Sequence, residues 1–394
     1  MRTPFSLLYY FLSLCIYIIS LPVILLYAFK PKYKESIPAR FFLNKTPPFS
    51  REGIWFHACS LGEARALSPL IEDIAKTTPV NISVITHTGF EAASAYKQAQ
   101  VRYLPYELFM PFWQNKQKLL IVLEAELWFM LFLVAKARGS KTVLLNGRIS
   151  DRSYTKYLKM KWFYSRLFKY IDVIYVQSKI DLERFKSLGA TNLKVMGNIK
   201  LAQKIEVNQE YTKPNGLSII AGSTHEGEEK LIIEAFLDFK KLHNERLHLI
   251  VVPRHPERFK EVKNLMKKYA DEFSLNFSCF SEDKNLDYDM VLIDKMGELN
   301  NMYAISDIAV LGGAFAPIGG HNPLEPIAFG CKIISGKKIF NQTELFKYIK
   351  NAQLIEDKDL VSAFSKALSL PASSIDEKVD LHEIKKLIKD CTNV

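Results

Sequence analysis

Short apolar runs that alternate with amphipathic segments are the feature that most restricts how this chain can fold. Each run has the length of a buried strand, and most intervening segments show the apolar spacing of a helix. Strands separated by helices are typical of βαβ units, whose neighbouring strands are parallel. The pattern therefore predicts an α/β protein with doubly wound parallel sheets. The expected strands are Ile54–Ala58, Ile82–Thr86, Val101–Pro105, Leu119–Leu123, Thr142–Leu145, Val173–Gln177, Leu193–Met196, Leu217–Ala221, Leu247–Val252, Met290–Ile293, Ile308–Leu311 and Lys332–Ile334.

A polar interval from Gln203 to Gly216, which contains Pro214, interrupts this alternation. The alternation restarts at Leu217, and a chain of 394 residues is long enough for two domains that each have a core of their own. We therefore expect two Rossmann-like, doubly wound domains that face a cleft, formed by residues 31–205 and residues 206–394.

The segment Pro4–Phe29 contains no charged side chain and is rich in Leu, Ile, Tyr and Phe. Because about 20 apolar residues can span a bilayer, residues 1–30 are expected to form a transmembrane or membrane-anchoring helix. An interfacial helix is the main alternative, since a cleaved signal peptide would have a shorter apolar run and an A-x-A site. Four basic residues lie from position 30 to position 40, and only Arg2 precedes the segment. The positive-inside rule then predicts that the body lies on the cytoplasmic side.

The formal net charge of +11 predicts an anionic partner, such as a nucleic acid, a membrane surface or a phosphorylated substrate. The sequence has no zinc-finger spacing, RNP-like motif or helix-turn-helix pattern, which disfavours nucleic acid. The segment Arg152–Ile171 mixes basic and aromatic residues at helical spacing. It is either a packed helix with a solvated face or a contact for anionic lipid or substrate phosphate. The five cysteines are scattered without a C-x-x-C motif, which is typical of reduced thiols.

Acidic side chains follow two expected strands of the first domain. Glu63 follows the first strand in the sequence C-S-L-G-E, where it either closes a capping box with Ser60 or acts as a general base. Glu124 and Glu126 follow the very apolar strand Leu119–Leu123. A carboxylate at the end of a buried strand is costly unless it faces a cleft or has a partner. We expect Glu124 to be the functional one of the two.

Four strand ends of the second domain carry polar or glycine-rich loops, and their convergence on one sheet edge predicts a nucleotide-type pocket. The stretch Val310–Gly330 is predicted to form a strand, a glycine loop and the start of a helix. Asn322 suits the N-cap, Pro323 the first helical position and Glu325 the third. The glycines and the helix N-terminus offer a place for a phosphate, and Glu325 is placed to accept hydrogen bonds from ribose hydroxyls.

Asp287-Tyr288-Asp289 has the D-x-D pattern of metal-dependent sugar transferases, but it precedes a strand and is expected to form a turn. The histidines lack a zinc-ligand spacing such as H-E-x-x-H, and the P-loop and G-x-S-x-G patterns are missing from the sequence. We therefore expect no metal and no cofactor, and a P-loop enzyme or an α/β-hydrolase is disfavoured.

Taken in order, eight motifs closely resemble the Kdo transferases, bacterial enzymes that add 3-deoxy-D-manno-oct-2-ulosonic acid (Kdo) to lipid A precursors. The resemblance extends from the N-terminal segment to about Asn341, and the last part of the chain shares only general character. The motifs are C-S-L-G-E, L-E-A-E-L-W, N-G-R-I-S, G-N-I-K, S-T-H-E-G-E-E, V-P-R-H-P-E-R-F, M-G-E-L and G-G-H-N-P-L-E-P.

The resemblance implies a GT-B fold, CMP-Kdo as donor and lipid IVA or a similar lipid A precursor as acceptor, at the bacterial inner membrane. It implies that Glu63 is the base and that Glu124 and Lys200, the lysine of G-N-I-K, stabilise the transition state. Three neighbours of these groups differ from residues common in the family, and we expect tuning rather than loss of function from Cys59, Ala125 and Gly147. The positions that match CMP-binding residues are Pro253, Arg254, Met296, Gly297, Glu298, Asn322, Pro323, Leu324 and Glu325.

Two other functions are compatible with the sequence. The chain could be a GT-B transferase that uses another nucleotide sugar on a membrane acceptor. It could also be a non-catalytic membrane protein that binds anionic lipid through Arg152–Ile171, although that function leaves the acidic motifs unexplained.

Overall fold

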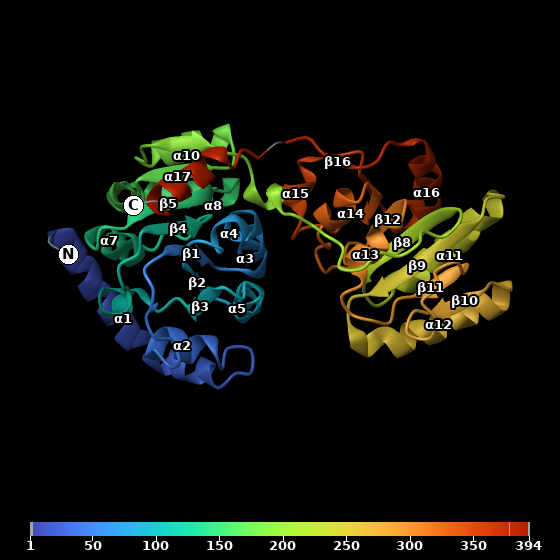
Figure 1. The fold of residues 1–394 in the computed structure, drawn as a ribbon, viewed down its shortest axis with the longest axis horizontal. Helices are drawn as coiled ribbons and strands as arrows, with labels where there is room; N and C mark the ends of the chain where they lie inside the picture. Colours follow the sequence, from blue (N-terminus) through green and yellow to red (C-terminus); the bar gives the residue numbers. More distant parts are fainter. Residues whose placement is uncertain (1–2, 378, 393–394) are drawn as a thin grey trace. The chain divides into compact units, whose positions relative to one another are not determined.

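The computed structural model describes residues 3–377 and 379–392, which form two compact units (Figure 1). The first unit comprises residues 3–204 and 379–392, and the second comprises residues 205–377. Each unit is built on a parallel sheet with helices packed against it. The α/β class and the two Rossmann-like domains predicted from the sequence are confirmed.

The sheet of the first unit contains seven parallel strands, and its strand order reverses once. The strands are β1 (Ile54–Ala58), β2 (Val80–Val84), β3 (Ala99–Tyr103), β4 (Leu119–Leu123), β5 (Lys141–Gly147), β6 (Val173–Val176) and β7 (Leu193–Val195). Their order is β3-β2-β1-β4-β5-β6-β7, so the chain leaves β1 toward one edge and then returns to add β4 on its other side. Every residue of β1, β2 and β4 is buried, as expected for strands that are covered on both faces.

The second unit repeats this plan. Its main sheet contains β8 (Leu217–Thr224), β9 (Leu247–Pro253), β10 (Phe277–Cys279), β11 (Met290–Leu292), β12 (Ile308–Leu311), β13 (Lys332–Gly336) and β15 (Gln353–Ile355). The order is β10-β11-β9-β8-β12-β13-β15, which reverses between β8 and β12. A small antiparallel pair is formed by β14 (Ile349–Lys350) and β16 (Ser374–Ile375).

Every strand expected from the sequence is present, and β1, β4 and β12 have the predicted bounds. The strands that the sequence did not predict, β10, β14, β15 and β16, are two or three residues long. Such short segments carry too few apolar residues to show a period.

Helices connect the strands in both units. The α-helices of the first unit are α1 (Pro4–Ala28), α2 (Ser36–Phe42), α3 (Leu61–Ala66), α4 (Ser68–Ile74), α5 (His87–Ser94), α6 (Met110–Trp113), α7 (Phe129–Ala137), α8 (Asp151–Lys159), α9 (Lys161–Leu167), α10 (Lys179–Ser187) and α17 (His382–Thr392). Those of the second unit are α11 (Glu228–Leu242), α12 (Phe259–Phe273), α13 (Leu299–Tyr303), α14 (Leu324–Ala328), α15 (Thr343–Phe346) and α16 (Leu360–Ser369).

The last helix, α17, corrects the expected domain boundary. Residues 206–394 were expected to form the second domain, but α17 packs on the first unit (Figure 1). Its apolar stripe of Ile384, Leu387 and Ile388 joins the core that covers β1 and β4. Lys385 of this helix lies 2.5 Å from Asp73 of α4. The sequence shows that α17 is amphipathic, but it does not show which of two similar sheets the apolar stripe covers.

The segment expected to anchor the chain forms the single helix α1, which is the one helix among the described residues that is long and apolar enough to cross a membrane. One face of α1 is docked on the first unit. Tyr9 donates a hydrogen bond to Glu107, Tyr10 to the carbonyl of Leu108 at 3.2 Å, and Tyr17 to the carbonyl of Phe41 at 2.7 Å. The helix is therefore a candidate membrane anchor that also belongs to the packing of the first unit. Its exposed apolar side chains include Leu7, Leu8, Phe11, Leu12, Ile16, Ile18, Ile19, Val23 and Leu26.

Removal of residues 1–29 is expected to leave a first unit that folds but unfolds at a lower temperature, because Glu107 loses its hydrogen bond from Tyr9. Glu107 is buried, and burial raises its pKa to about 7. Leaving a buried acceptor without its donor costs about 1–3 kcal/mol. The truncated chain should also bind anionic vesicles more weakly, and the remaining binding should be sensitive to salt. Thermal unfolding and vesicle sedimentation measure the two effects.

Tyr9→Phe is the matched control for this truncation, because it removes only the hydroxyl group. It should lower the unfolding temperature and leave vesicle binding unchanged. A truncated chain that does not fold would show that residues 1–29 are core rather than anchor.

Candidate active site

The loops at the carboxyl ends of the strands carry the expected catalytic and nucleotide-binding residues. In the first unit the strand order reverses between β1 and β4, and Glu63 and Glu124 lie in the segments that follow these two strands. Ligands of open α/β sheets bind at such a reversal, because the loops there leave toward opposite faces of the sheet and a crevice opens between them. In the second unit the reversal lies between β8 and β12.

Glu63 has the capping-box contacts that its sequence motif predicts. The side chain of Ser60 accepts the N–H of Glu63 at 3.3 Å, and the Ser60 hydroxyl donates to Glu63 Oε1 at 2.8 Å. The backbone N–H of Cys59 donates to Glu63 Oε2 at 2.8 Å. These contacts fix the carboxyl group at the start of α3, next to the end of β1.

The same carboxyl group has an unusual protonation equilibrium. Burial, followed by the charge of Glu124, raises the pKa of Glu63 to about 7, against the lowering effect of the hydrogen bonds from Cys59 and Ser60. A carboxyl group with a pKa near neutrality is matched to general acid–base work at physiological pH. The structure therefore gives Glu63 a capping geometry together with the protonation behaviour of a base.

Glu124 is paired with Lys200. Lys200 Nζ lies 2.5 Å from Glu124 Oε1, and both side chains are partly buried. Glu124 has a φ of 56°, in the left-handed region that residues with a Cβ rarely adopt. Strain of this kind persists where the surrounding structure holds it and is common at functional sites. The structure thus brings Glu63, Glu124 and Lys200 together within the first unit.

The N-G-R motif holds the turn that carries Lys200. Asn146, which also has a positive φ of 61°, accepts the N–H of Ile199 at 3.0 Å through Oδ1. Asn198 accepts the N–H of Lys200 at 3.1 Å. Asn146 at the end of β5 therefore supports the G-N-I-K segment that follows β7, a relation that the sequence did not predict.

Glu126, the other acid of L-E-A-E-L-W, has a different environment from Glu124. Its carboxylate accepts the indole N–H of Trp128 at 2.8 Å and interacts electrostatically with Arg40 and Cys59. These contacts lie within the first unit and hold the loop after β4. The charge of Glu126 also acts on Glu63, but less strongly than that of Glu124.

Among the described residues, His57, Cys59 and Glu126 form the group whose ligand atoms are close enough to hold a metal ion, within 4.8 Å of one another. The charge of Arg40 acts on all three side chains. A fixed guanidinium at this position opposes the binding of a second cation. The group therefore does not resemble an open catalytic metal site.

In the second unit, the residues expected to bind the nucleotide follow β9, β11 and β12 at the carboxyl edge. Pro253 ends β9 and the exposed Arg254 follows it. Gly297 has a φ of 89°, which places Met296 on an exposed turn. Glu298 is buried and accepts hydrogen bonds from Lys295, Tyr211 and Asn301, so it shapes this turn from within.

The glycine loop after β12 is held by a side chain from another element. Glu228 at the start of α11 accepts the N–H of Gly313 at 2.8 Å and those of Phe315 and Ala316 at 3.0 Å. These three loop N–H groups already have an acceptor within the chain, so a phosphate beside the glycines would have to find other donors. The sequence could not show this, because Glu228 lies 85 residues before Gly313.

The helix after this loop begins one residue later than expected, at Leu324, with Pro323 before its first residue. Pro323 rather than Asn322 is therefore at the N-cap, but Asn322 Oδ1 still accepts the N–H of Leu324, the first helical residue, at 3.1 Å. Asn322 Nδ2 also donates to Glu325 at 3.3 Å. Asn322, Pro323, Leu324 and Glu325 therefore lie together at the carboxyl edge of the sheet, as expected.

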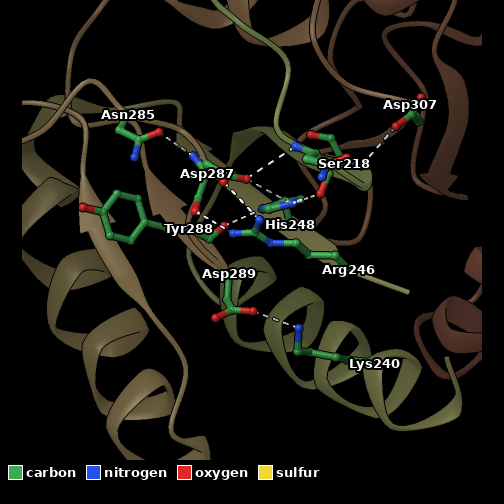
Figure 2. Close-up of polar contacts among 10 residues, drawn as sticks. Ser218, Lys240, Arg246, His248, Asn285, Asp287, Tyr288, Asp289 and Asp307 are labelled. Atoms are coloured by element: carbon green, nitrogen blue, oxygen red, sulfur yellow. Dashed lines mark hydrogen bonds and ion pairs between the residues drawn. The ribbon is translucent and has the colours of Figure 1, made fainter. Parts of the chain in front are cut away.

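The D-x-D sequence lies at the opposite edge of the second sheet, because it directly precedes β11. Figure 2 shows Asp287 and Asp289 with their polar neighbours. Asp287 and Asp289 precede β11, and their carboxylates have cationic partners. Asp287 lies 3.1 Å from Arg246, and Asp289 accepts a hydrogen bond from Lys240 at 2.9 Å. The sequence therefore lies in an irregular segment directly before β11, outside any helix or strand, and the absence of a metal stays a prediction.

The family model of 3-deoxy-D-manno-octulosonic-acid transferase (kdotransferase) matches residues 35–203. The 3-deoxy-D-manno-octulosonic acid transferase of Haemophilus influenzae is 35% identical over 362 residues, which cover 86% of this chain and 83% of that protein. A bifunctional glycosyltransferase/methyltransferase of Fusobacterium nucleatum is 35% identical over 374 residues, and this chain spans only 56% of its length.

Among solved structures, the C-terminal CMP-Kdo binding domain of WaaA from Acinetobacter baumannii is 26% identical, with a TM-score of 0.35 over 45% of this chain and 88% of that domain. The identity to the Haemophilus influenzae enzyme, over most of both chains, carries the assignment. The chain is a glycosyltransferase that belongs to the 3-deoxy-D-manno-octulosonic acid (Kdo) transferase family.

Proposed function

We propose that the chain transfers Kdo from CMP-Kdo to a lipid A precursor of the lipid IVA type, with Glu63 as the general base. The observation that carries this proposal is the grouping of Glu63, Glu124 and Lys200 at the strand reversal of the first unit. Membership of the Kdo transferase family supports Kdo as the transferred sugar.

The transfer reaction requires three chemical roles, and these residues can fill them. Glu63 takes the proton from the attacking acceptor hydroxyl, which its pKa of about 7 permits at neutral pH. The anomeric carbon gains positive charge as the CMP group leaves, and the carboxylate of Glu124 stabilises that charge. Lys200, 2.5 Å from Glu124, holds the Glu124 carboxylate in position and provides positive charge for the departing phosphate.

The donor is proposed to bind to the second unit through Arg254, the turn of Met296 and Gly297, and the segment from Asn322 to Glu325. The support is that these residues share the carboxyl edge of one sheet and that the sequence motifs match. The body is proposed to lie on the cytoplasmic side of the membrane, where α1 holds it close to a lipid acceptor.

Incubation with CMP-Kdo and a tetraacylated acceptor, followed by mass spectrometry, tests this function. The expected product is heavier than the acceptor by one or more Kdo units. Parallel assays with UDP- and GDP-sugars test the alternative donors. A product formed only from a UDP- or GDP-sugar would replace CMP-Kdo, and CMP binding without any transfer would favour the non-catalytic alternative.

Arg254→Ala and Glu325→Ala are expected to weaken CMP binding by about 10- to 150-fold each, because the loss of a charge-assisted hydrogen bond costs about 1.5–3 kcal/mol. Isothermal titration calorimetry with CMP measures the effect. Lys260→Ala is a matched control, since it removes an exposed cation from α12 in the same unit. CMP affinity that equals that of the control in both variants would remove these residues from the donor site.

Activity is expected to survive EDTA, because the D-x-D carboxylates are paired with Arg246 and Lys240. A donor with one phosphate also needs less charge neutralisation than a nucleoside diphosphate. Initial rates with and without EDTA provide the measurement. Loss of activity on chelation that a divalent cation restores would contradict the proposal of a metal-free mechanism.

A further inference from the structure

Two histidines that the proposed mechanism does not use meet at the strand reversal of the second unit. His225 follows β8 and His321 follows β12, the neighbouring strands between which the order reverses. Their Nε2 atoms are 2.9 Å apart, and the rings are nearly parallel, at 14°. In such a contact one imidazole donates and the other accepts, so both rings can be neutral.

Other groups around the pair make the site attractive to an anion. The ring of His255 lies edge-on to that of His225, with 5.4 Å between the ring centres. The charge of Arg254 acts on both His225 and His321. Three neighbouring strands, β9, β8 and β12, thus direct cationic or ionisable side chains toward one point of the carboxyl edge.

The carboxylates that face His225 are already engaged. Glu228 accepts the N–H of His225 at 2.9 Å in addition to three N–H groups of the glycine loop. Glu229 is paired with Arg258 and accepts the hydroxyl of Thr224. Both acids therefore fix the loops, and their charges raise the pKa of His225 against the larger, lowering effect of burial.

Glu228 also determines how the two histidines meet, because it joins the loop of His225 to the glycine loop that leads to His321. Gly313 has a φ of 70°, and a Cβ at this position would lie 3.2 Å from the His321 ring and 3.5 Å from that of His225. The glycine thus leaves room beside the rings. The surrounding loops therefore hold the two rings in contact at the edge of the sheet, and the contact is not an accidental one between two surface side chains.

The environment of the pair favours its neutral form in the absence of an anion. Burial, followed by the charges of His225 and Arg254, lowers the pKa of His321 to about 4. Burial also lowers the pKa of His225. The charge of Glu228 opposes this lowering, and the charge of His255 adds to it. A bound anion reverses this balance, because it stabilises an imidazolium and raises the pKa of the pair.

We propose that the His225–His321 pair binds the phosphate of the nucleotide donor and takes up one proton from solvent when it does so. This inference rests on the proposed function, because it assigns a binding site to the phosphate of the proposed donor. The imidazolium donates a hydrogen bond to a phosphate oxygen, and Arg254 supplies a second positive charge. The same proton then remains close to the phosphate as CMP departs, which favours the leaving group.

Proton uptake makes donor affinity depend on pH with a defined sign. In the free pair the pKa of His321 is lowered to about 4 and that of His225 is also lowered, and the complexed pair has a higher pKa than the free one. Between the pKa of the free pair and that of the complexed pair, affinity rises as pH falls, by up to about tenfold per pH unit for one proton. The test uses the methyl ester of CMP, a phosphodiester like the donor, because its single charge does not change in this range.

Calorimetry on the full chain should show affinity for the ester that rises from pH 8 to pH 5.5, with proton uptake measured in buffers of different ionisation enthalpy. Cytidine, which lacks the phosphate, should bind with an affinity that does not change with pH. His225→Asn and His321→Asn should bind the ester at least about tenfold more weakly at pH 5.5 and lose the pH dependence. They should bind cytidine as the parent does. His382→Asn, an exposed histidine of α17, is the control that should match the parent throughout.

The result that overturns the inference is ester binding that is independent of pH in the parent, or that stays pH-dependent in both variants. A parent that binds neither ester nor cytidine would instead contradict the proposed donor. In that case sulfate, an anion that does not titrate here, decides the inference. Histidine NMR signals of the parent that shift with sulfate at pH 5.5 but not at pH 8 support it, and signals that do not shift overturn it.

Discussion

Glu63→Gln is expected to lower the turnover number by about 10²–10⁴-fold while the fold and the affinity for CMP stay the same. The substitution keeps the size of the side chain and removes its ability to accept a proton. General base catalysis is worth about 3–5 kcal/mol of barrier on this scale. CMP is proposed to bind to the second unit, so its affinity reports separately on the donor site.

The capping box alone would give a different result. Gln can serve at the third helical position, and its carbonyl oxygen can still accept the hydrogen bond from Ser60 or from Cys59. A purely structural Glu63 would therefore be replaced with little change in turnover. A Glu63→Gln enzyme within a few-fold of the parent would refute the assignment of the base, and Glu124 would then be the next candidate.

The pH dependence of turnover provides a second test of the same variant. A general base must be ionised, so kcat of the parent, measured at saturating donor, should rise with pH through an apparent pKa of about 7. In Glu63→Gln this rising limb should be lost. A parent profile that is flat between pH 5 and pH 8 would show that a group other than Glu63 limits the reaction.

Stability should change in the opposite direction to activity. The pKa of Glu63 is raised in the folded protein from 4.5 to about 7, so its ionisation destabilises the fold as pH rises through this interval. The loss amounts to about 3 kcal/mol above pH 7. Glu63→Gln avoids this ionisation and should be at least as stable as the parent at pH 8. Thermal unfolding would thereby exclude misfolding as the cause of lost turnover.

The strands and the positions of the acidic residues that follow them were predictable because their signals are local. A run such as Leu119–Leu123 is apolar throughout and has the length of a strand covered on both faces, and Glu124 follows it directly. A parallel sheet then places strand ends at one edge, which brings Glu124 to the same edge as Glu63. The raised pKa of Glu63 was not predictable, because it depends on burial and on the distance to Glu124.

The features that the sequence did not reveal all depend on contacts between distant segments. Glu228 meets the glycine loop across 85 residues, and His225 meets His321 across 96. The motifs T-H-E-G-E-E and G-G-H-N mark both positions, but no spacing shows that they touch. The placement of α17 on the first unit has the same cause, since its apolar stripe fits either sheet by composition.

Lys200→Met is expected to lower turnover by about 10²–10³-fold, the usual effect of removing one preorganised charge-stabilising group. The control is Lys194→Met, because Lys194 is paired with Glu383 at 2.7 Å on an exposed surface, where an ion pair contributes little. Initial rates and thermal unfolding of both variants separate a catalytic loss from a structural one. Turnover of Lys200→Met equal to that of the control would exclude Lys200 from the mechanism.

The pair of Lys200 and Glu124 also predicts two pH shifts of opposite sign. In Lys200→Met the charge of Glu124 has lost the partner that lies 2.5 Å away, so it should raise the pKa of Glu63 further. The rising limb of the pH profile should then move to higher pH. Glu124→Gln removes the charge that, after burial, is the largest cause of the raised pKa of Glu63, so the limb should move to lower pH. If both variants move the limb in the same direction, Glu124 does not act on Glu63 through its charge. Opposite shifts, together with reduced turnover in both variants, would instead identify Glu63, Glu124 and Lys200 as one electrostatic unit. In such a unit the ion pair sets the pKa of the base and stabilises the charge that develops on the donor.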